Sequence, residues 1–104
     1  MSFLSLALYG ITDLFVAIFI VLPSINNIND SLMVFGYLLA KFFMQWRKMT
    51  FSPAHPAGKA FYAGTDAFTA WFLYSNMMEL GSLASGMWMF YVLRTLINLA
   101  GINL

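Results

Sequence analysis

The chain has 104 residues, of which 62% are hydrophobic and only 9% are charged. Soluble domains carry about 25% charged residues, so this composition excludes an ordinary cytosolic enzyme and a disordered tail, and it predicts an integral membrane protein. The formal net charge of +1 excludes the strong positive field that a nucleic-acid-binding protein uses. Because the chain has no cysteine, it has no disulfide, no thiolate metal site and no cysteine nucleophile.

The first apolar run, residues 3–22, is long enough to cross a membrane as a helix. Pro23 is expected to end it, and the polar turn that follows leads to Asp30 or Ser31 as the N-cap of the next helix. Residues 1–24 contain no lysine or arginine, whereas a cleaved signal peptide begins with a basic segment. We therefore expect the first helix to be retained.

The second expected span, residues 31–48, is short and contains Lys41, whose ammonium group would have to extend to the lipid headgroups. Residues 47–59 combine prolines, a glycine and basic side chains, and we expect them to form a loop outside the membrane. Two further spans, residues 60–80 and 83–103, are separated by a tight turn. The predicted fold class is an all-α integral membrane bundle of four transmembrane helices, or of three if the short second span does not cross.

The basic residues indicate an orientation in the membrane. Four of the five lie between Lys41 and Lys59. Lysine and arginine gather on the cytoplasmic side of membrane proteins, so the 47–59 loop is predicted to face the cytoplasm, or the matrix of a mitochondrion. A bacterial or mitochondrial inner membrane is the expected location, and the whole chain, residues 1–104, is expected to form one transmembrane domain.

Asp13, Asp66 and Arg94 fall inside the predicted spans, where a charge is costly unless it has a partner. At about 1.5 Å per residue, Asp13 and Arg94 both lie near the middle of the membrane, and Asp66 lies within reach of a long arginine side chain. We expect an ion pair of Arg94 with Asp13, with Asp66 or with both. Its first interpretation is structural, fixing the register of the helices. There are two alternatives: the charged residues take part in moving protons or substrate, or they pair with residues of another subunit.

Other polar, small and aromatic residues are interpreted as packing or surface residues. Gly81, Ser85 and Gly86 are expected to let helices approach closely, and Trp71 is expected to pack inside the bundle. His55 is the single histidine and is expected on the surface of the loop, because one histidine makes neither a zinc site nor a pair of haem ligands. The sequence contains no phosphate-binding loop, metal-ligand cluster or catalytic triad. We therefore expect no cofactor, no metal and no catalytic residue.

The loops are too short to hold an active site, so an enzyme acting alone is not expected. We expect a small accessory subunit of a larger membrane complex of respiratory, photosynthetic or ATP-synthase type, which contacts lipids and other integral membrane subunits. The alternative is a small four-helix transporter that acts as a homodimer with Asp13 as an intramembrane acidic site. In length, span number and an acid in the first helix, the chain is similar to the small multidrug-resistance exporters. Arg94 would neutralise that acid, which favours the subunit.

Overall fold

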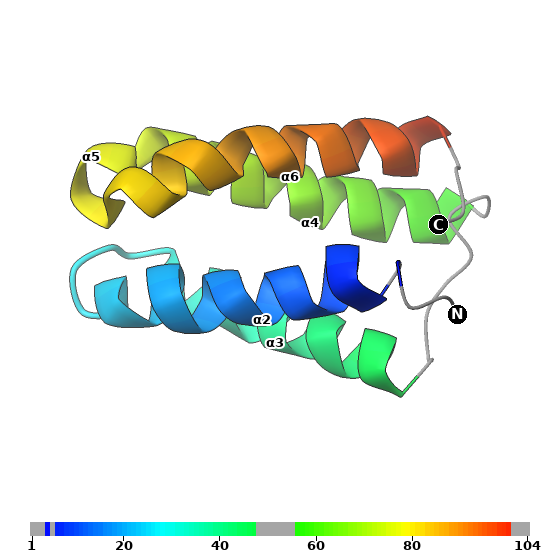
Figure 1. The fold of residues 1–104 in the computed structure, drawn as a ribbon, viewed down its shortest axis with the longest axis horizontal. Coiled ribbons are helices and arrows are strands. Elements are labelled where there is room, and N and C mark those ends of the chain that lie inside the picture. Colours follow the sequence, from blue (N-terminus) through cyan, green and yellow to red (C-terminus); the bar gives the residue numbers. More distant parts are fainter. Residues whose placement is uncertain (1–3, 5, 48–55, 101–104) are drawn as a thin grey trace. The chain divides into compact units, whose positions relative to one another are not determined.

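The computed structural model describes residues 4, 6–47 and 56–100, and every regular element among them is helical (Figure 1). The all-α class expected from the sequence is therefore confirmed for these residues. The contacts within the chain divide it into two compact units, Met1–Thr50 and Phe51–Asn103. Each unit is a helical hairpin, and the expectation of a single transmembrane domain stays a prediction.

The first unit begins with a helical segment whose winding changes along its length. Two π-helical stretches enclose a short α-helix and a 3-10 turn follows; in chain order these are η1 (Leu6–Ile11), α2 (Thr12–Val16), η2 (Ala17–Val21) and η3 (Leu22–Ser24). Thr12 Oγ1 donates to the Ala7 carbonyl at 3.0 Å, five residues back, beside the wide π turns. Pro23 lies in the first turn of η3, where its missing N–H is tolerated. The segment therefore ends after Pro23, not before it.

A turn leads back to α3 (Ser31–Trp46), which packs against η1, α2 and η2. Ser24 Oγ donates to the Val21 carbonyl at 2.8 Å and lies 2.8 Å from Ser31 Oγ, so Ser31 supplies the hydrogen of the bond between the two hydroxyls. Asp30 is the N-cap residue of α3, although its side chain makes no capping hydrogen bond to the described backbone. The buried residues of α3 recur every three or four positions: Ser31, Val34, Leu38, Lys41 and Gln45.

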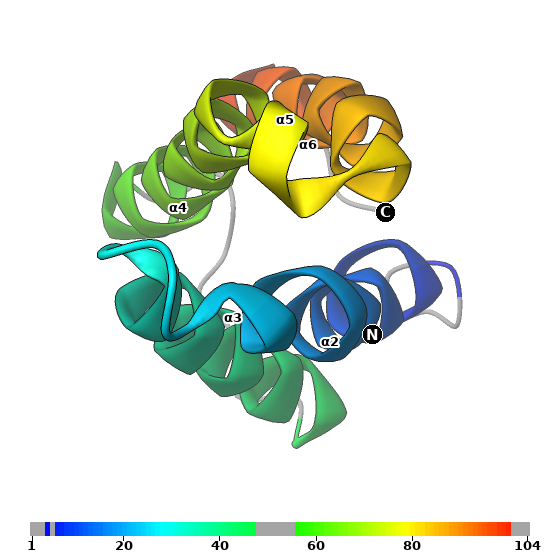
Figure 2. The same ribbon diagram turned by 90° about the vertical axis from the view of Figure 1, so that its left-hand side faces the viewer.

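The second unit pairs α4 (Pro56–Ser75) with α6 (Ser82–Ala100), and the end-on view in Figure 2 shows these two helices side by side. α4 begins at Pro56, four residues before the expected start of the third span. Proline suits the first position of a helix because the N–H that it lacks has no partner there. The loop expected over 47–59 is therefore wrong for residues 56–59, and residues 48–55 lie outside the described part of the chain.

A short helix, α5 (Met77–Leu80), and a glycine turn join α4 to α6. Asn76 leaves the helical conformation, and its Nδ2 donates to the Phe72 carbonyl at 2.9 Å. Gly81 has φ +96° and ψ −172°, a conformation that is open to glycine and costly for a residue with a Cβ. The span expected over 60–80 is therefore interrupted at Asn76, and the tight turn is made by Gly81.

Two described helices are long and apolar enough to cross a membrane, Ala7–Ser24 and α6. α3 has 16 residues, fewer than the roughly 20 of a typical spanning helix. α4 has 20 residues, but the polar groups along it make it less apolar than these two. Two candidate spans support a membrane location. The bundle of four membrane-crossing helices stays a prediction.

Candidate functional site

The second unit holds a buried ionic cluster between α4 and α6, made by Asp66, Arg94 and Asn98. Arg94 Nη2 lies 3.1 Å from Asp66 Oδ1, and Asn98 Nδ2 donates a hydrogen bond of 2.8 Å to Asp66 Oδ2. Both carboxylate oxygens of Asp66 therefore meet a donor, and all three residues are at most 4% exposed. Hydrogen bonds to a charged group are stronger than neutral ones, so this Asp66 cluster holds α4 and α6 in one register.

Helical spacing explains why these side chains meet. Tyr91, Arg94 and Asn98 recur at intervals of three and four residues, which places them on one face of α6, and all three are buried. The Arg94 guanidinium carbon also lies 4.6 Å from the centre of the Tyr91 ring, a distance at which the ring attracts the cation. On α4, Asp66 and Thr69 share the buried face by the same spacing. These polar residues therefore line the contact between α4 and α6.

The first unit holds a second buried ion pair, between Asp13 of α2 and Lys41 of α3. Lys41 Nζ lies 4.0 Å from Asp13 Oδ2, and the two side chains are 3% and 0% exposed. This distance suits an ion pair but is longer than a direct hydrogen bond. Asp13 lies in the first α-helical turn after the π-helical η1, and π turns occur frequently at functional sites.

The burial of Lys41 corrects the expectation that its ammonium group extends to the lipid headgroups. Lys41 follows Leu38 by three residues and precedes Gln45 by four, so it belongs to the buried face of α3. The same periodicity is visible in the sequence and could have identified Lys41 as an internal cation. The sequence interpretation instead placed it at the membrane surface on the basis of its charge.

Gln45 is a further polar residue that the sequence interpretation did not single out. It is 9% exposed. Its Oε1 is buried and accepts no hydrogen bond from the residues that the structure describes. Its position four residues after Lys41 is the pattern that could have drawn attention to it.

The structure brings together Asp66 and Arg94, one of the pairings that the sequence left open. Asp13 and Arg94 belong to different units, so a contact between these two stays a prediction. Glu79, the remaining acid of the second half of the chain, is exposed on α5. It can be solvated there without a basic partner.

The small residues expected in helix packing take other positions within the second unit. Gly81 makes the turn before α6, and Ser85 Oγ donates to the Ser82 carbonyl at 2.9 Å. Gly86 is exposed, and no described atom lies within 4 Å of the place where its Cβ would be. Close helix packing at these residues therefore stays a prediction for contacts outside the second unit. Trp71, expected inside the bundle, is 53% exposed because it lies five residues from Asp66, on the far side of α4.

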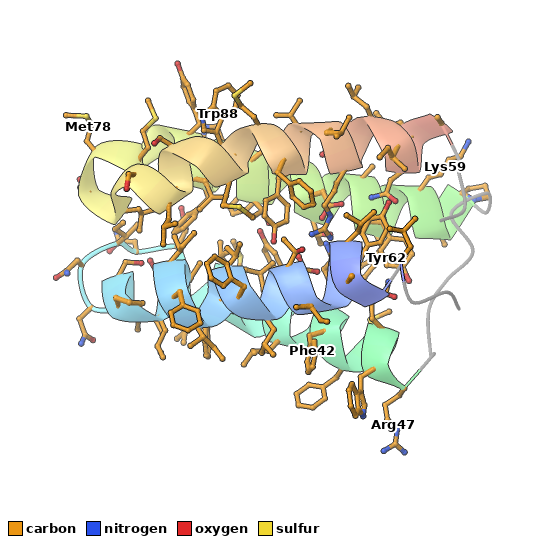
Figure 3. All side chains as sticks on the ribbon, viewed as in Figure 1. Phe42, Arg47, Lys59, Tyr62, Met78 and Trp88 are labelled. Atoms are coloured by element: carbon orange, nitrogen blue, oxygen red, sulfur yellow. The ribbon has the colours of Figure 1, made fainter. Side chains whose placement is uncertain are left out.

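An open apolar groove lies on the outside of the second unit, between α4 and α6. Ala67 and Ala70 contribute small side chains to it, and Trp71, Tyr74 and Trp88 contribute large ones. The Tyr74 and Trp88 rings meet edge to face with their centres 5.0 Å apart. Figure 3 shows Trp88 projecting from α6.

No metal site is formed by the described ranges 4, 6–47 and 56–100, since no three histidine, cysteine, aspartate or glutamate residues gather there. His55 lies outside the described residues. The chemistry that the two units offer is charge pairing and hydrogen bonding inside, with apolar and aromatic surface outside.

Comparisons of the chain with protein-family models, with curated proteins and with solved structures find no match.

Proposed function

We propose that the chain is a small accessory subunit of a larger membrane protein complex, of the respiratory, photosynthetic or ATP-synthase type, and that it supports assembly of that complex. The observation that carries the proposal is the distribution of side chains. Asp13, Lys41, Asp66 and Arg94 are buried, while many large apolar side chains are exposed. Soluble monomers rarely expose apolar patches beyond a few hundred Å². In a membrane the same surface faces lipid tails or the helices of neighbouring subunits.

The outer surface of the second unit supports a protein neighbour in particular. Exposed apolar residues follow α6 along its length: Leu83, Met89, Val92, Leu93, Leu96 and Leu99. Beside them, Trp71 and Tyr74 are both 53% exposed at the groove. Tryptophan and tyrosine contribute strongly to protein interfaces, and small residues such as Ala67 and Ala70 let a neighbouring helix approach closely.

The proposal includes four membrane-crossing helices, with α3 as a short second span, and one orientation. Arg47 is exposed at the end of α3 and points away from it in Figure 3, while Asp30 lies exposed at the other end of that helix. In the second unit, Lys59 lies near the start of α4 and Glu79 is exposed on α5. Each hairpin therefore has a basic and an acidic end. The basic ends favour a cytoplasmic or matrix position for residues 47–59, in a bacterial or mitochondrial inner membrane.

Purification of the tagged full chain from its native membranes in a mild detergent tests the proposal. We expect partner proteins to co-migrate with the chain in a fixed ratio. Trp71→Ala is expected to lower recovery of the partner about tenfold, the loss typical of an interface residue worth about 1.4 kcal/mol. Met78→Ala is the control, because Met78 is 93% exposed on α5 and lies outside the groove.

Two other results would contradict the proposal. A monomer without partners in native membranes would exclude a subunit role. A homodimer that moves lipophilic cations, with transport lost in Asp13→Asn, would support the four-helix transporter instead.

A further inference from the structure

The first helical segments of the two units share a sequence pattern. Residues 9–19 and 62–72 have the same amino acid at six of eleven positions, and both follow the pattern Tyr-x-x-Thr-Asp-x-Phe-x-Ala-x-Phe, where x is any residue. Asp13 and Asp66 are counterparts in this alignment, which needs no insertion or deletion. Similarity at a fixed spacing is the sequence signature of an internal repeat, and the spacing here is 53 residues.

The same spacing of 53 residues relates an acid, a base and an amide in one unit to those in the other. The first set is Asp13, Lys41 and Gln45, and the second set is Asp66, Arg94 and Asn98. In both sets the base follows the acid by 28 residues, and the amide follows the base by four. Each unit therefore carries the acid on its first helical segment and the base and amide on its second helix.

The burial of side chains follows the same alignment. The buried residues of α6 are Ala84, Tyr91, Arg94 and Asn98, and their counterparts in α3 are also buried, namely Ser31, Leu38, Lys41 and Gln45. In the first segments six pairs are buried on both sides: Tyr9 and Tyr62, Gly10 and Ala63, Asp13 and Asp66, Val16 and Thr69, Ala17 and Ala70, and Ile20 and Leu73. Two unrelated apolar helices have no reason to turn the same positions inward, because each helix could be rotated differently about its axis.

The charged pairs make corresponding contacts inside their own units. Lys41 Nζ lies 4.0 Å from Asp13 Oδ2, and Arg94 Nη2 lies 3.1 Å from Asp66 Oδ1. All four side chains are at most 3% exposed. Sequence, burial and ion pairing therefore agree on one alignment of the two units.

We propose that the chain consists of two copies of one helical hairpin, and that Asp13, Lys41 and Gln45 are the first copy's version of the Asp66 cluster. Each set holds the two helices of its hairpin in one register. The different distances follow from the residue types, because arginine presents a planar set of donors that fits a carboxylate, whereas lysine is a flexible point charge. The inference uses contacts within each unit only, so it does not depend on the accessory-subunit proposal.

Exchanging the base and the amide between the copies tests the proposal in the full chain. Lys41→Arg combined with Gln45→Asn gives the first hairpin the residues of the second. We expect Tm in detergent to rise by about 4–8 °C, the shift that one net hydrogen bond of average strength gives a chain of this size. The rise should be absent when the same exchange is made in a chain that carries Asp13→Asn.

The matched control places the same two residues one position further along α3. Phe42→Arg combined with Trp46→Asn lies off the face that carries Lys41 and Gln45, since Trp46 is 62% exposed. This control should not raise Tm. The proposal would be overturned if the exchange at positions 41 and 45 did not raise Tm, if its rise persisted with Asp13→Asn, or if the control raised Tm as well.

A second variant tests the repeat without changing any charge. Residues 9–19 are given the sequence of residues 62–72, which takes five substitutions: Gly10→Ala, Ile11→Gly, Leu14→Ala, Val16→Thr and Ile18→Trp. Its control introduces the same five residue types one position later: Ile11→Ala, Thr12→Gly, Phe15→Ala, Ala17→Thr and Phe19→Trp.

The aligned variant should unfold at a higher temperature than the shifted one. It places alanine and threonine at the buried positions 10 and 16, whose counterparts Ala63 and Thr69 are buried as well. The shifted set instead places threonine at Ala17, which is fully buried. If the aligned variant had a Tm equal to or below that of the shifted variant, the two hairpins would not be copies of one unit.

Discussion

At the scale of single residues, the two buried ionic clusters differ in the chemistry of their cations. Arginine stays protonated inside proteins and presents a planar set of donors that fits a carboxylate, whereas lysine is a flexible point charge. Arg94 meets Asp66 at 3.1 Å with Asn98 on the second oxygen, while Lys41 lies 4.0 Å from Asp13. We infer that the Asp66 cluster contributes more to the stability of its helical hairpin than the Lys41 pair does.

Arg94→Leu tests the structural importance of the Asp66 cluster. Removing one partner leaves an uncompensated buried charge on Asp66, so we expect a loss of about 3–5 kcal/mol in the free energy of unfolding and a low yield of folded protein. Adding Asp66→Asn should restore most of the loss, because both charges are then absent. Thermal unfolding in detergent measures both effects. Recovery with Asp13→Asn in place of Asp66→Asn would identify Asp13 as the energetically dominant partner of Arg94.

Lys41→Met is expected to destabilise the chain less than Arg94→Leu does. The longer distance to Asp13 indicates a weaker direct interaction, although burial still makes the lone carboxylate unfavourable. Asp13→Asn in the same chain should restore stability. The same unfolding assay measures the difference. If Lys41→Met had no effect, the ammonium group would not be the partner that neutralises Asp13.

At the scale of elements, each long helix lies where an apolar run predicted one, but the helices begin and end at other residues than the sequence predicted. The first segment continues through Pro23 to Ser24, and α4 begins at Pro56. Proline ends a helix when it removes a needed donor, and it is accepted in the first turn of one. Whether a proline ends a helix or starts one depends on the turns next to it. The presence of Pro23 and Pro56 alone therefore predicted the helix ends only approximately. Asn76 interrupts a run that is apolar enough to be read as continuous.

Gly81 and Gly86 form a matched pair for testing the turn before α6. A Cβ at either position would meet no described atom within 4 Å. Alanine at these positions therefore creates no new side-chain contact, and its effect comes from the conformational preference of the backbone. Gly81→Ala should cost about 1–3 kcal/mol because of its positive φ. Gly86→Ala, inside α6, should instead stabilise the chain by up to about 1 kcal/mol through helix propensity. Thermal unfolding in detergent measures both changes. If the two substitutions changed the free energy of unfolding equally, the positive φ of Gly81 would not be what determines the turn.

At the scale of the whole molecule, the distribution of charge predicts an orientation that can be measured directly. The chain has no cysteine, so a single introduced thiol gives labelling without background. Ala57→Cys, on the exposed start of α4, should react with a membrane-impermeant maleimide only from the cytoplasmic or matrix side. Asn27→Cys, in the exposed turn before α3, should react only from the opposite side. Labelling of both residues from one side would contradict the proposed crossing by α3.

The sequence by itself determined the helical class, the approximate places of the apolar runs, and the charged residues that need partners. These follow from local properties, namely helical periodicity and the cost of a charge in an apolar run. Only the tertiary structure decided that Arg94 meets Asp66, that Asp13 is the carboxylate beside Lys41, and that Trp71 lies outside. These outcomes depend on the rotation of each helix about its axis. That rotation is set by all the contacts along the helix together, so no single spacing in the sequence predicts it.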